Sequence, residues 1–257
     1  LLATSFARYL SKRYQIIVLT TKSTYPSYRV SQKDKWFLWK KEVIHDQLTV
    51  IRVANIFFGK KFFARLISDL SFSLVSLFAS LWIFNIRHVL LSSPPFFLGF
   101  VALFLKYIKR VPYTLDVRDV YPDSLIEINF LKSPIVITIL KNWEKLFYKH
   151  AYQILTVGIK VSERIASRTN TPVRVIYNGV DIDWFDTHAQ KNSYSDARLL
   201  KSQEKKIIHV GNLGRLYEFD MMLDAAKLLQ SQGFQFIFIG DGFQKESMQE
   251  RCEKEQI

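Results

Sequence analysis

The sequence predicts a two-domain α/β protein with mostly parallel sheets, and three observations lead to this prediction. Short apolar runs rich in β-branched residues alternate with longer segments whose apolar residues recur every three or four positions. This is the pattern of strands alternating with helices, which predicts a parallel sheet covered on both faces. A polar, weakly patterned stretch over residues 188–205 precedes a closing strand–helix–strand unit. The length of 257 residues is sufficient for two such domains.

The individual elements follow from the same two periodicities, taken in chain order. Strands are expected over residues 15–20, 36–43, 48–54, 88–91, 113–117, 152–157, 173–177, 206–210 and 234–239. Helices are expected over residues 1–10, 62–84, 96–109, 133–149, 160–167, 219–229 and 245–257. Pro95 and Pro134 suit a first helical turn, and residues 92–95 are expected to form a turn. Gly233 is the expected C-terminal glycine of the helix before the last strand.

The helix over residues 62–84 is apolar enough to be compared with a membrane span. Seventeen residues without a charge lie between Asp69 and Arg87. A helix needs about 20 apolar residues to cross a bilayer, and four serines dilute this run. A core or interfacial helix is therefore favoured over a transmembrane helix.

The positive charge of the protein lies in its first 110 residues. These residues hold 17 Lys and Arg against 4 Asp and Glu, whereas the remainder of the chain is neutral. Aromatic residues are interleaved with basic ones over residues 36–41 and 57–65. Such a mixture suits an anionic membrane surface, and it also suits single-stranded nucleic acid. Because no RNP, zinc-finger or helix-turn-helix pattern accompanies it, the membrane is the preferred partner of residues 1–110 and nucleic acid is not expected.

Several catalytic classes have no motif in this chain. It contains no Gly-x-Gly-x-x-Gly fingerprint, no P-loop, no Gly-x-Ser-x-Gly elbow and no His-Glu-x-x-His. Its single cysteine, Cys252, and its five scattered histidines form neither a disulfide framework nor a metal-site pattern. No metal and no cofactor are therefore expected, and the lone cysteine suits a reducing compartment.

Two glycine turns in the closing strand–helix–strand unit form the best candidate ligand site. The residues concerned are Gly211, Asn212, Gly214 and Arg215 after the first strand, and Gly240 and Asp241 after the second. Glycine lets backbone N–H groups approach a phosphate, and the start of the next helix favours negative charge. Arg215 adds one fixed positive charge. The alternatives are that the glycines only make tight turns and that Asp241 caps the next helix.

A second candidate site follows the predicted strand over residues 113–117. Asp116, Arg118 and Asp119 lie at its carboxyl end, which is where open α/β sheets bind ligands. Arg118 suits a phosphate or carboxylate, and Asp119 suits the acceptance of a hydroxyl proton. The alternative is a salt-bridged loop. Asn178 and Gly179 follow a later strand, where a tight turn is favoured over a ligand contact.

Five stretches in a fixed order also resemble a known family. They are LLSSPPFFLGF, TLDVRDVYPDS, VIYNGVDIDWF, HVGNLGRLYEFDMMLDAAKLL and FIGDG. In this order they resemble the GT-B-fold glycosyltransferases of family 4, especially the bacterial members that build O-antigen and capsule, including fucosamine-transferase-like ones. The resemblance implies two Rossmann-like domains facing a cleft: residues 1–187 on the acceptor side, residues 188–205 as a linker, and residues 206–257 as the start of the nucleotide-sugar domain.

The resemblance further implies the reaction and the partners. A sugar would pass from a nucleotide sugar, expected to be a UDP-sugar, to a lipid-linked saccharide, with retained anomeric configuration and usually no metal. The protein would be cytoplasmic and peripheral on the inner face of the cell membrane.

The resemblance also assigns roles to the candidate residues. The donor diphosphate would be lined by Gly211, Asn212, Gly214 and Arg215. The catalytic candidates are Asp119 and Arg118, and the remaining cleft candidates are Asp116, Asn178, Gly179, Gly240 and Asp241. Many family members have Arg at the position of Asn212 and Lys at that of Tyr217, so Arg215 is the hypothetical replacement for one of them.

Both ends of the chain are interpreted as cut, so the second domain is expected to be incomplete. The resemblance implies a glycine-rich loop before Leu1 and a Glu-x7-Glu-type donor segment after Ile257, so the chain alone is expected to be inactive. Two other functions stay open. One is a GT-B-fold sugar-nucleotide epimerase or hydrolase, and the other is a non-catalytic remnant that binds a membrane or a partner enzyme.

Overall fold

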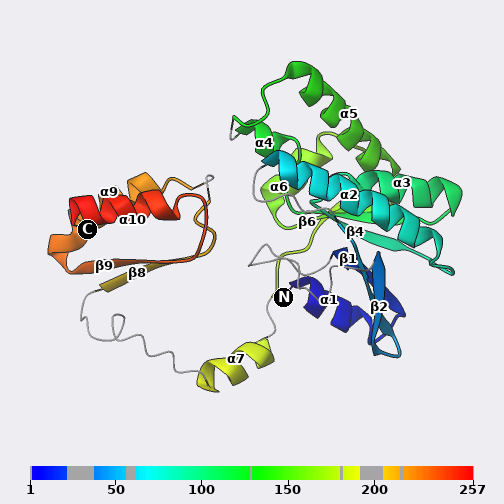
Figure 1. Cartoon of the computed structure of the whole chain (residues 1–257), viewed down its shortest axis with the longest axis horizontal. Coiled ribbons are helices and arrows are strands. Elements are labelled where there is room, and N and C mark those ends of the chain that lie inside the picture. Colours follow the sequence, from blue (N-terminus) through cyan, green and yellow to red (C-terminus); the bar gives the residue numbers. More distant parts are fainter. Residues whose placement is uncertain are drawn as a thin grey trace. The chain divides into compact units, whose positions relative to one another are not determined.

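The computed structural model describes residues 2–21, 38–55, 62–127, 129–179, 182–191, 205–214 and 217–256 (Figure 1). The chain divides into two compact units, Leu1–Ile182 and Asp183–Ile257. Both units contain a parallel sheet together with helices, which confirms the predicted α/β class.

The elements of the first unit are listed here in chain order. They are α1 (Leu2–Leu10), β1 (Ile16–Thr21), β2 (Trp39–His45), β3 (Leu48–Val53), α2 (Phe62–Leu81), β4 (Val89–Ser93), α3 (Leu98–Ile108), β5 (Tyr113–Val117), α4 (Asp123–Glu127), α5 (Pro134–His150), β6 (Gln153–Thr156), α6 (Ile159–Ala166) and β7 (Val173–Val175). α7 (Ile182–Lys191) begins at the boundary between the units. The second unit continues with β8 (Lys205–Val210), α9 (Phe219–Leu229), the 3-10 turn η2 (Gln230–Gln232), β9 (Phe234–Ile239) and α10 (Lys245–Glu255).

The first unit contains two sheets. In the three-stranded sheet, β3 is central, parallel to β1 and antiparallel to β2. The four-stranded sheet has the order β4-β5-β6-β7, and all of its neighbouring strands are parallel. β5 is buried on both faces: Tyr113, Leu115 and Val117 on one face and Thr114 on the other are at most 2% exposed. Its sequence alternates apolar and polar residues, and the polar side chains of Thr114 and Asp116 form hydrogen bonds with His88 and Arg118.

Helix α3 lies between α2 and α5 in the packing of the first unit. Gly99 on α3 faces the ring of Phe147 on α5, and a Cβ at this position would collide with that ring. The absence of a side chain therefore allows the two helices to approach closely. Phe96 and Phe100 complete the aromatic contact, with ring centroids 5.2 and 4.9 Å from that of Phe147.

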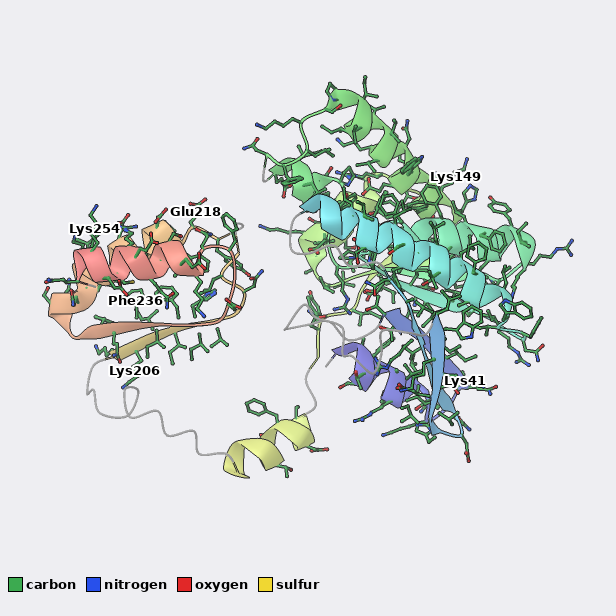
Figure 2. All side chains as sticks on the ribbon, in the orientation of Figure 1. Lys41, Lys149, Lys206, Glu218, Phe236 and Lys254 are labelled. Carbon is green, nitrogen blue, oxygen red and sulfur yellow. The ribbon has the colours of Figure 1, made fainter. Side chains whose placement is uncertain are left out.

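The second unit is described by itself. β8 and β9 pair in parallel, and Figure 1 shows α9 and α10 on one face of this two-stranded sheet. Phe236 points toward these helices, whereas Lys206 points away from them (Figure 2). Leu213, Phe219, Leu223 and Met248 form the buried cluster between the layers. Gly233 has a φ of 77°, which confirms its predicted role at the end of the helical segment.

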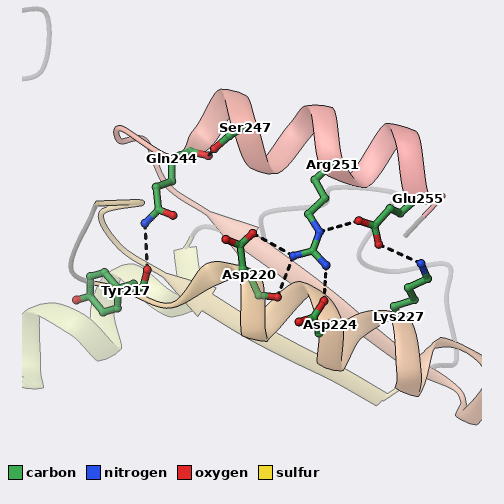
Figure 3. A network of polar contacts seen from close by, with 8 residues as sticks. All are labelled: Tyr217, Asp220, Asp224, Lys227, Gln244, Ser247, Arg251 and Glu255. Carbon is green, nitrogen blue, oxygen red and sulfur yellow. Dashed lines mark hydrogen bonds and ion pairs between the residues drawn. The ribbon is translucent and has the colours of Figure 1, made fainter.

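A single arginine ties α10 to α9 (Figure 3). Arg251 on α10 forms ion pairs with Asp220 and Asp224 on α9, and it also pairs with Glu255 one turn later. Glu255 in turn accepts a hydrogen bond from Lys227 at 3.1 Å. The network holds the first turn of α9 against α10, and it offsets the negative charge of Asp220 next to the glycine turns.

The bounds of some elements differ from the sequence predictions. β4 extends through Ser92 and Ser93, which were expected in a turn, because both residues continue the parallel register with β5. The helix over residues 62–84 ends at Leu81. α4 and α7 were not predicted as helices. α4 has only five residues, and the last residues of α7 lie in the polar, weakly patterned stretch that begins at residue 188.

Within the described residues, no helix is both long enough and apolar enough to cross a bilayer. The loop expected over residues 21–35 lies almost entirely outside the described part of the chain.

Candidate functional site

The carboxyl edge of the four-stranded sheet gathers residues from three of its strands. Because the strands are parallel, the ends of β4, β5 and β7 lie along the same edge. Asp116 is the penultimate residue of β5, and Arg118 follows that strand directly. The Arg118 N–H donates to the Ser93 carbonyl oxygen at 3.2 Å, which continues the pairing with β4 one residue beyond β5. Asn178 follows β7 after two intervening residues.

Arg118 connects Asp116 with Asn178 at this edge. Its Nε donates to Asp116 Oδ2 at 2.9 Å, and its Nη1 donates to Asn178 Oδ1 at 3.2 Å. Ser92 Oγ donates to the same Asp116 oxygen at 3.3 Å. The Arg118 side chain remains 37% exposed, whereas that of Asp116 is 17% exposed. The carboxylate and the Asn178 amide oxygen therefore fix Nε and Nη1 of the guanidinium, and Nη2, which has no hydrogen bond to another described residue, can hold an anionic oxygen.

Asp119 lies apart from this ion pair. It is exposed, and it lines a small hollow together with Ser93, Tyr121 and Glu144. No hydrogen bond or ion pair of Asp119 is found among the described residues. Burial raises the pKa of the neighbouring Tyr121 hydroxyl to about 12. The structure thus places the two predicted catalytic residues in adjacent but separate settings: Arg118 within a hydrogen-bonded group and Asp119 at the mouth of a hollow.

Below the hollow lies a buried charged cluster that the sequence did not reveal. Glu144 is 2% exposed and accepts hydrogen bonds from Tyr148 Oη at 2.9 Å and from Arg168 Nη1 at 3.1 Å. Arg168 also pairs with the buried Asp123, which Arg164 contacts at 2.9 Å. Burial raises the pKa of Glu144, although the hydrogen bond from Tyr148 and the charge of Arg168 act in the opposite direction.

The buried cluster connects α4, α5 and α6 directly behind the carboxyl edge. Leu140, Glu144 and Phe147 share the buried face of α5, so the spacing of Glu144 with these apolar residues was a usable signal. Gly179, the last candidate in this unit, is exposed, and a Cβ at this position would meet only open space.

In the second unit, the two glycine turns pack directly against each other. The Gly211 N–H donates to the Ile239 carbonyl oxygen at 3.0 Å, and the Leu213 N–H donates to the Asp241 carbonyl oxygen at 3.0 Å. A Cβ on Gly240 would collide with the Gly211 carbonyl oxygen. A Cβ on Gly242 would collide with the Leu213 carbonyl oxygen. These two glycines therefore have a packing role that is independent of any ligand.

This packing leaves only part of the first turn for a ligand. Within the described residues, the backbone amides of Asn212 and Gly214 donate no backbone hydrogen bond, in contrast to those of Gly211 and Leu213. Arg215 lies outside the described residues. The Gln244 side chain donates to the carbonyl oxygens of Gly214 at 2.7 Å and Tyr217 at 3.0 Å, so the second turn also braces the chain that enters α9 (Figure 3).

The helices α9 and α10 begin beside these turns. Their N-terminal ends carry partial positive charge, which favours an anion. Asp241 is exposed, and its Oδ1 accepts from the Gly242 N–H at 3.0 Å. Asp241 lies four residues before Lys245, the first residue of α10, and Gln244 occupies the cap position instead. His209 packs against Tyr217 and Phe219 beneath the first turn, and its buried Nε2 atom has no hydrogen-bond partner among the described residues.

Within the part of the chain that the structure describes, no three His, Cys, Asp or Glu side chains form a metal-binding group.

Comparison with known proteins gives one informative similarity. The chain is 25% identical over 162 residues to a probable glycosyltransferase, WbjE, of Pseudomonas aeruginosa. The match covers 58% of this chain and 39% of that protein, so the chain spans less than half of the relative's length. No protein-family model matches the chain. The similarity supports a glycosyltransferase function in general terms.

Proposed function

We propose that this protein is a retaining GT-B-fold glycosyltransferase of family 4, which acts in the synthesis of a cell-surface polysaccharide such as O-antigen or capsule. It would transfer a sugar from a nucleotide sugar, with UDP as the expected nucleotide, to a lipid-linked saccharide. The observation that carries this proposal is the similarity to a probable glycosyltransferase. The α/β class with parallel sheets fits it.

The second unit supplies the proposed donor side. The backbone amides of Asn212 and Gly214, which donate no backbone hydrogen bond to another described residue, would stabilise the diphosphate of the donor together with the N-terminal ends of α9 and α10 and the charge of Arg215. As the glycosidic bond to the diphosphate breaks, negative charge develops on the leaving oxygen. Donors that are fixed before the reaction stabilise that charge without reorganisation, which accelerates bond breaking. Arg251 assists by neutralising Asp220 in the first turn of α9.

The first unit supplies the proposed acceptor side. Arg118 is fixed by Asp116 and Asn178 and would hold an anionic or polar group of the acceptor. Asp119 is exposed at the same edge and would accept the proton of the attacking hydroxyl. The basic charge of residues 1–110 would attract the protein to the anionic inner face of the cell membrane, where a lipid-linked acceptor resides.

The donor side is tested with Arg215→Ala in the full-length protein. Turnover of the nucleotide sugar should fall by about a hundredfold, because one charge-stabilising donor contributes about that much. Arg174→Ala, which removes an exposed arginine from β7, is the matched control and should leave turnover unchanged. Unchanged turnover in Arg215→Ala would remove this residue from the mechanism. Consumption of the nucleotide sugar without any acceptor would instead indicate an epimerase or hydrolase.

A further inference from the structure

Helix α2 exposes its large apolar side chains and buries its small polar ones. All of the exposed side chains among residues 66–82 are apolar, and they are Ile67, Leu70, Leu74, Phe78, Leu81 and Trp82. We call this set the α2 stripe. Its spacing of three and four residues places it on one face of the helix. Phe78 is 59% exposed, and Trp82, directly after the helix, is 71% exposed.

The opposite face of α2 carries the serines. Ser68, Ser73, Ser76 and Ser80 are buried, and they share this face with Phe72 and Ala79. Ser73 and Ser80 donate to carbonyl oxygens of the helix itself, and Ser68 accepts a hydrogen bond from Asn55 Nδ2 at 3.0 Å. A surface helix of a soluble protein normally shows the reverse arrangement. A continuous exposed apolar stripe marks a surface that binds something.

The charges around the α2 stripe have a single sign. The sequence contains no Asp or Glu between Asp69 and Asp116. Asp69 itself lies on the inner side of α2, where its charge acts on the half-buried Tyr121. At the C-terminal end of the stripe, Lys109 donates to the carbonyl oxygens of Ser80, Leu81 and Ile83 at 2.7–2.9 Å. Its Nζ lies 5.5 Å from the ring centroid of Phe84, which is 73% exposed.

Two further cations stand at the same end of α2. Arg87 follows α2 and Arg110 follows α3, and both are exposed. Neither forms an ion pair with another described residue. Lys109 fixes the end of α3 to the end of α2, so these cations and the aromatic residues Trp82 and Phe84 belong to one region of the first unit.

We propose that the α2 stripe is the surface with which the protein docks onto an anionic lipid bilayer. The helix would lie in the plane of the interface with Leu74 and Phe78 among the acyl chains, as amphipathic interfacial helices do. Trp82 and Phe84 would lie at the level of the headgroups, and Arg87 and Arg110 would contact lipid phosphates. This inference rests on the membrane location proposed above, and it identifies the side of the protein that faces the lipid.

A bilayer fits the α2 stripe better than a protein partner does. Apart from the indole N–H of Trp82, the stripe offers no hydrogen-bonding or charged group that would define the orientation of a partner protein, whereas a lipid surface requires none. The positive charge beside it, without any acid nearby in the sequence, complements anionic headgroups.

The stripe is tested by co-sedimentation with phosphatidylcholine vesicles that contain phosphatidylglycerol. Leu74→Ser/Phe78→Ser should weaken vesicle binding by about tenfold or more, because two large apolar side chains no longer enter the membrane. Ile135→Ser/Ile139→Ser removes two exposed side chains from α5 and is the matched control, for which binding should be unchanged. Circular dichroism confirms that each variant is folded. Equal binding of the α2 and α5 variants would overturn the proposal.

The charges are tested separately. Arg87→Glu/Arg110→Glu should abolish the preference for vesicles that contain phosphatidylglycerol over pure phosphatidylcholine vesicles. Lys141→Glu/Lys145→Glu makes the same change of charge on exposed positions of α5 and should retain the preference. Loss of the preference in both variants would show that only net charge matters and would overturn the assignment of this surface.

A fluorescent probe reports directly on insertion. Cys252 is the single cysteine of the chain, so Cys252→Ala provides a background for labelling. An environment-sensitive dye attached through Leu74→Cys should shift to the blue when anionic vesicles are added, and the same dye attached through Ile135→Cys should not. The absence of a shift would contradict the proposal. A dimer found by sedimentation equilibrium would also contradict it if Leu74→Ser/Phe78→Ser dissociates that dimer.

These assays contain no nucleotide sugar and are independent of the proposed reaction. Transfer to a short-chain acceptor without vesicle binding would overturn the docking surface alone. Vesicle binding without transfer would overturn the proposed reaction alone.

Discussion

Arg118 and Asn178 are 60 positions apart in the chain, and a 3.2 Å hydrogen bond from Nη1 to Oδ1 joins them. The bond connects the end of β5 with the loop after β7. Together with Asp116, it fixes the guanidinium at the carboxyl edge of the parallel sheet. Its geometry means that Arg118 and Asn178 should act as one unit in any reaction at this edge.

This coupling predicts non-additive effects on catalysis. In the full-length protein, Arg118→Ala should lower kcat/KM for sugar transfer by about a hundredfold, because the group that holds the acceptor is lost. Asn178→Ala should lower it by about tenfold through misplacement of the arginine. The double variant should be no worse than Arg118→Ala alone. Asn170→Ala, at an exposed loop position, is the control, and additive losses would show that the two residues act independently.

The interlocked glycine turns predict a graded series of stabilities. Gly240→Ala should destabilise the second unit by about 1–3 kcal/mol, because its Cβ would overlap the Gly211 carbonyl oxygen. Gly233→Ala should cost about 1 kcal/mol, since its φ of 77° is unfavourable for alanine. Gly158→Ala, whose Cβ meets nothing within 4 Å, should have almost no effect. Urea unfolding measures the order of stability of these variants. A Gly240→Ala variant as stable as the wild type would contradict the observed packing.

The buried Glu144 predicts a pH-dependent difference in stability. Burial raises its folded-state pKa above the ordinary value of 4.5, so the folded protein binds this proton more readily than the unfolded chain. The resulting stabilisation is complete below the unfolded pKa and is lost as the pH rises through the folded pKa. Relative to Glu144→Gln, the wild type should therefore lose stability as the pH is raised from about 5 to about 8.

Urea unfolding of both proteins across this pH range measures the difference. Glu163→Gln removes an exposed carboxyl from α6 and should show no such trend. If the wild type instead gains stability relative to Glu144→Gln as the pH rises, the ion pair with Arg168 outweighs the cost of burial.

The local order of elements was largely predictable from the sequence. β5 and β9 have the bounds that the sequence predicts, because the apolar–polar alternation of β5 and the mostly apolar run of β9 are both typical of strands. The helix starting at Pro134 was predictable for a similar reason, since proline suits a first helical turn. α7 was not predicted because most of its residues are polar and its last residues lie in the weakly patterned stretch that begins at residue 188.

The tertiary contacts were harder to predict from the sequence. The sequence placed Asp116 and Arg118 at a strand end, but the contact with Asn178 depends on the strand order β5-β6-β7, which periodicity does not encode. The glycine turns were predicted as a ligand site, and the structure shows that Gly240 and Gly242 are also required for packing. The roles assigned to Asp119, Asn212, Gly214 and Arg215 stay predictions.

The orientation of α2 could also not be predicted from the sequence. Its apolar residues occur on more than one face, so the pattern alone did not show which face would be buried. The buried serines decide the orientation, because their small side chains face the first unit while Leu74 and Phe78 remain exposed.

The central claim is that this protein transfers a sugar, and product analysis tests it most directly. The full-length protein is incubated with a UDP-sugar labelled in its sugar and with a lipid-linked saccharide, and the products are separated and examined by NMR. The account predicts that the label enters the lipid-linked saccharide with retained anomeric configuration, and that Arg118→Ala largely abolishes this transfer. Label that appears only as free sugar or as an epimerised nucleotide sugar, with or without acceptor, would contradict it.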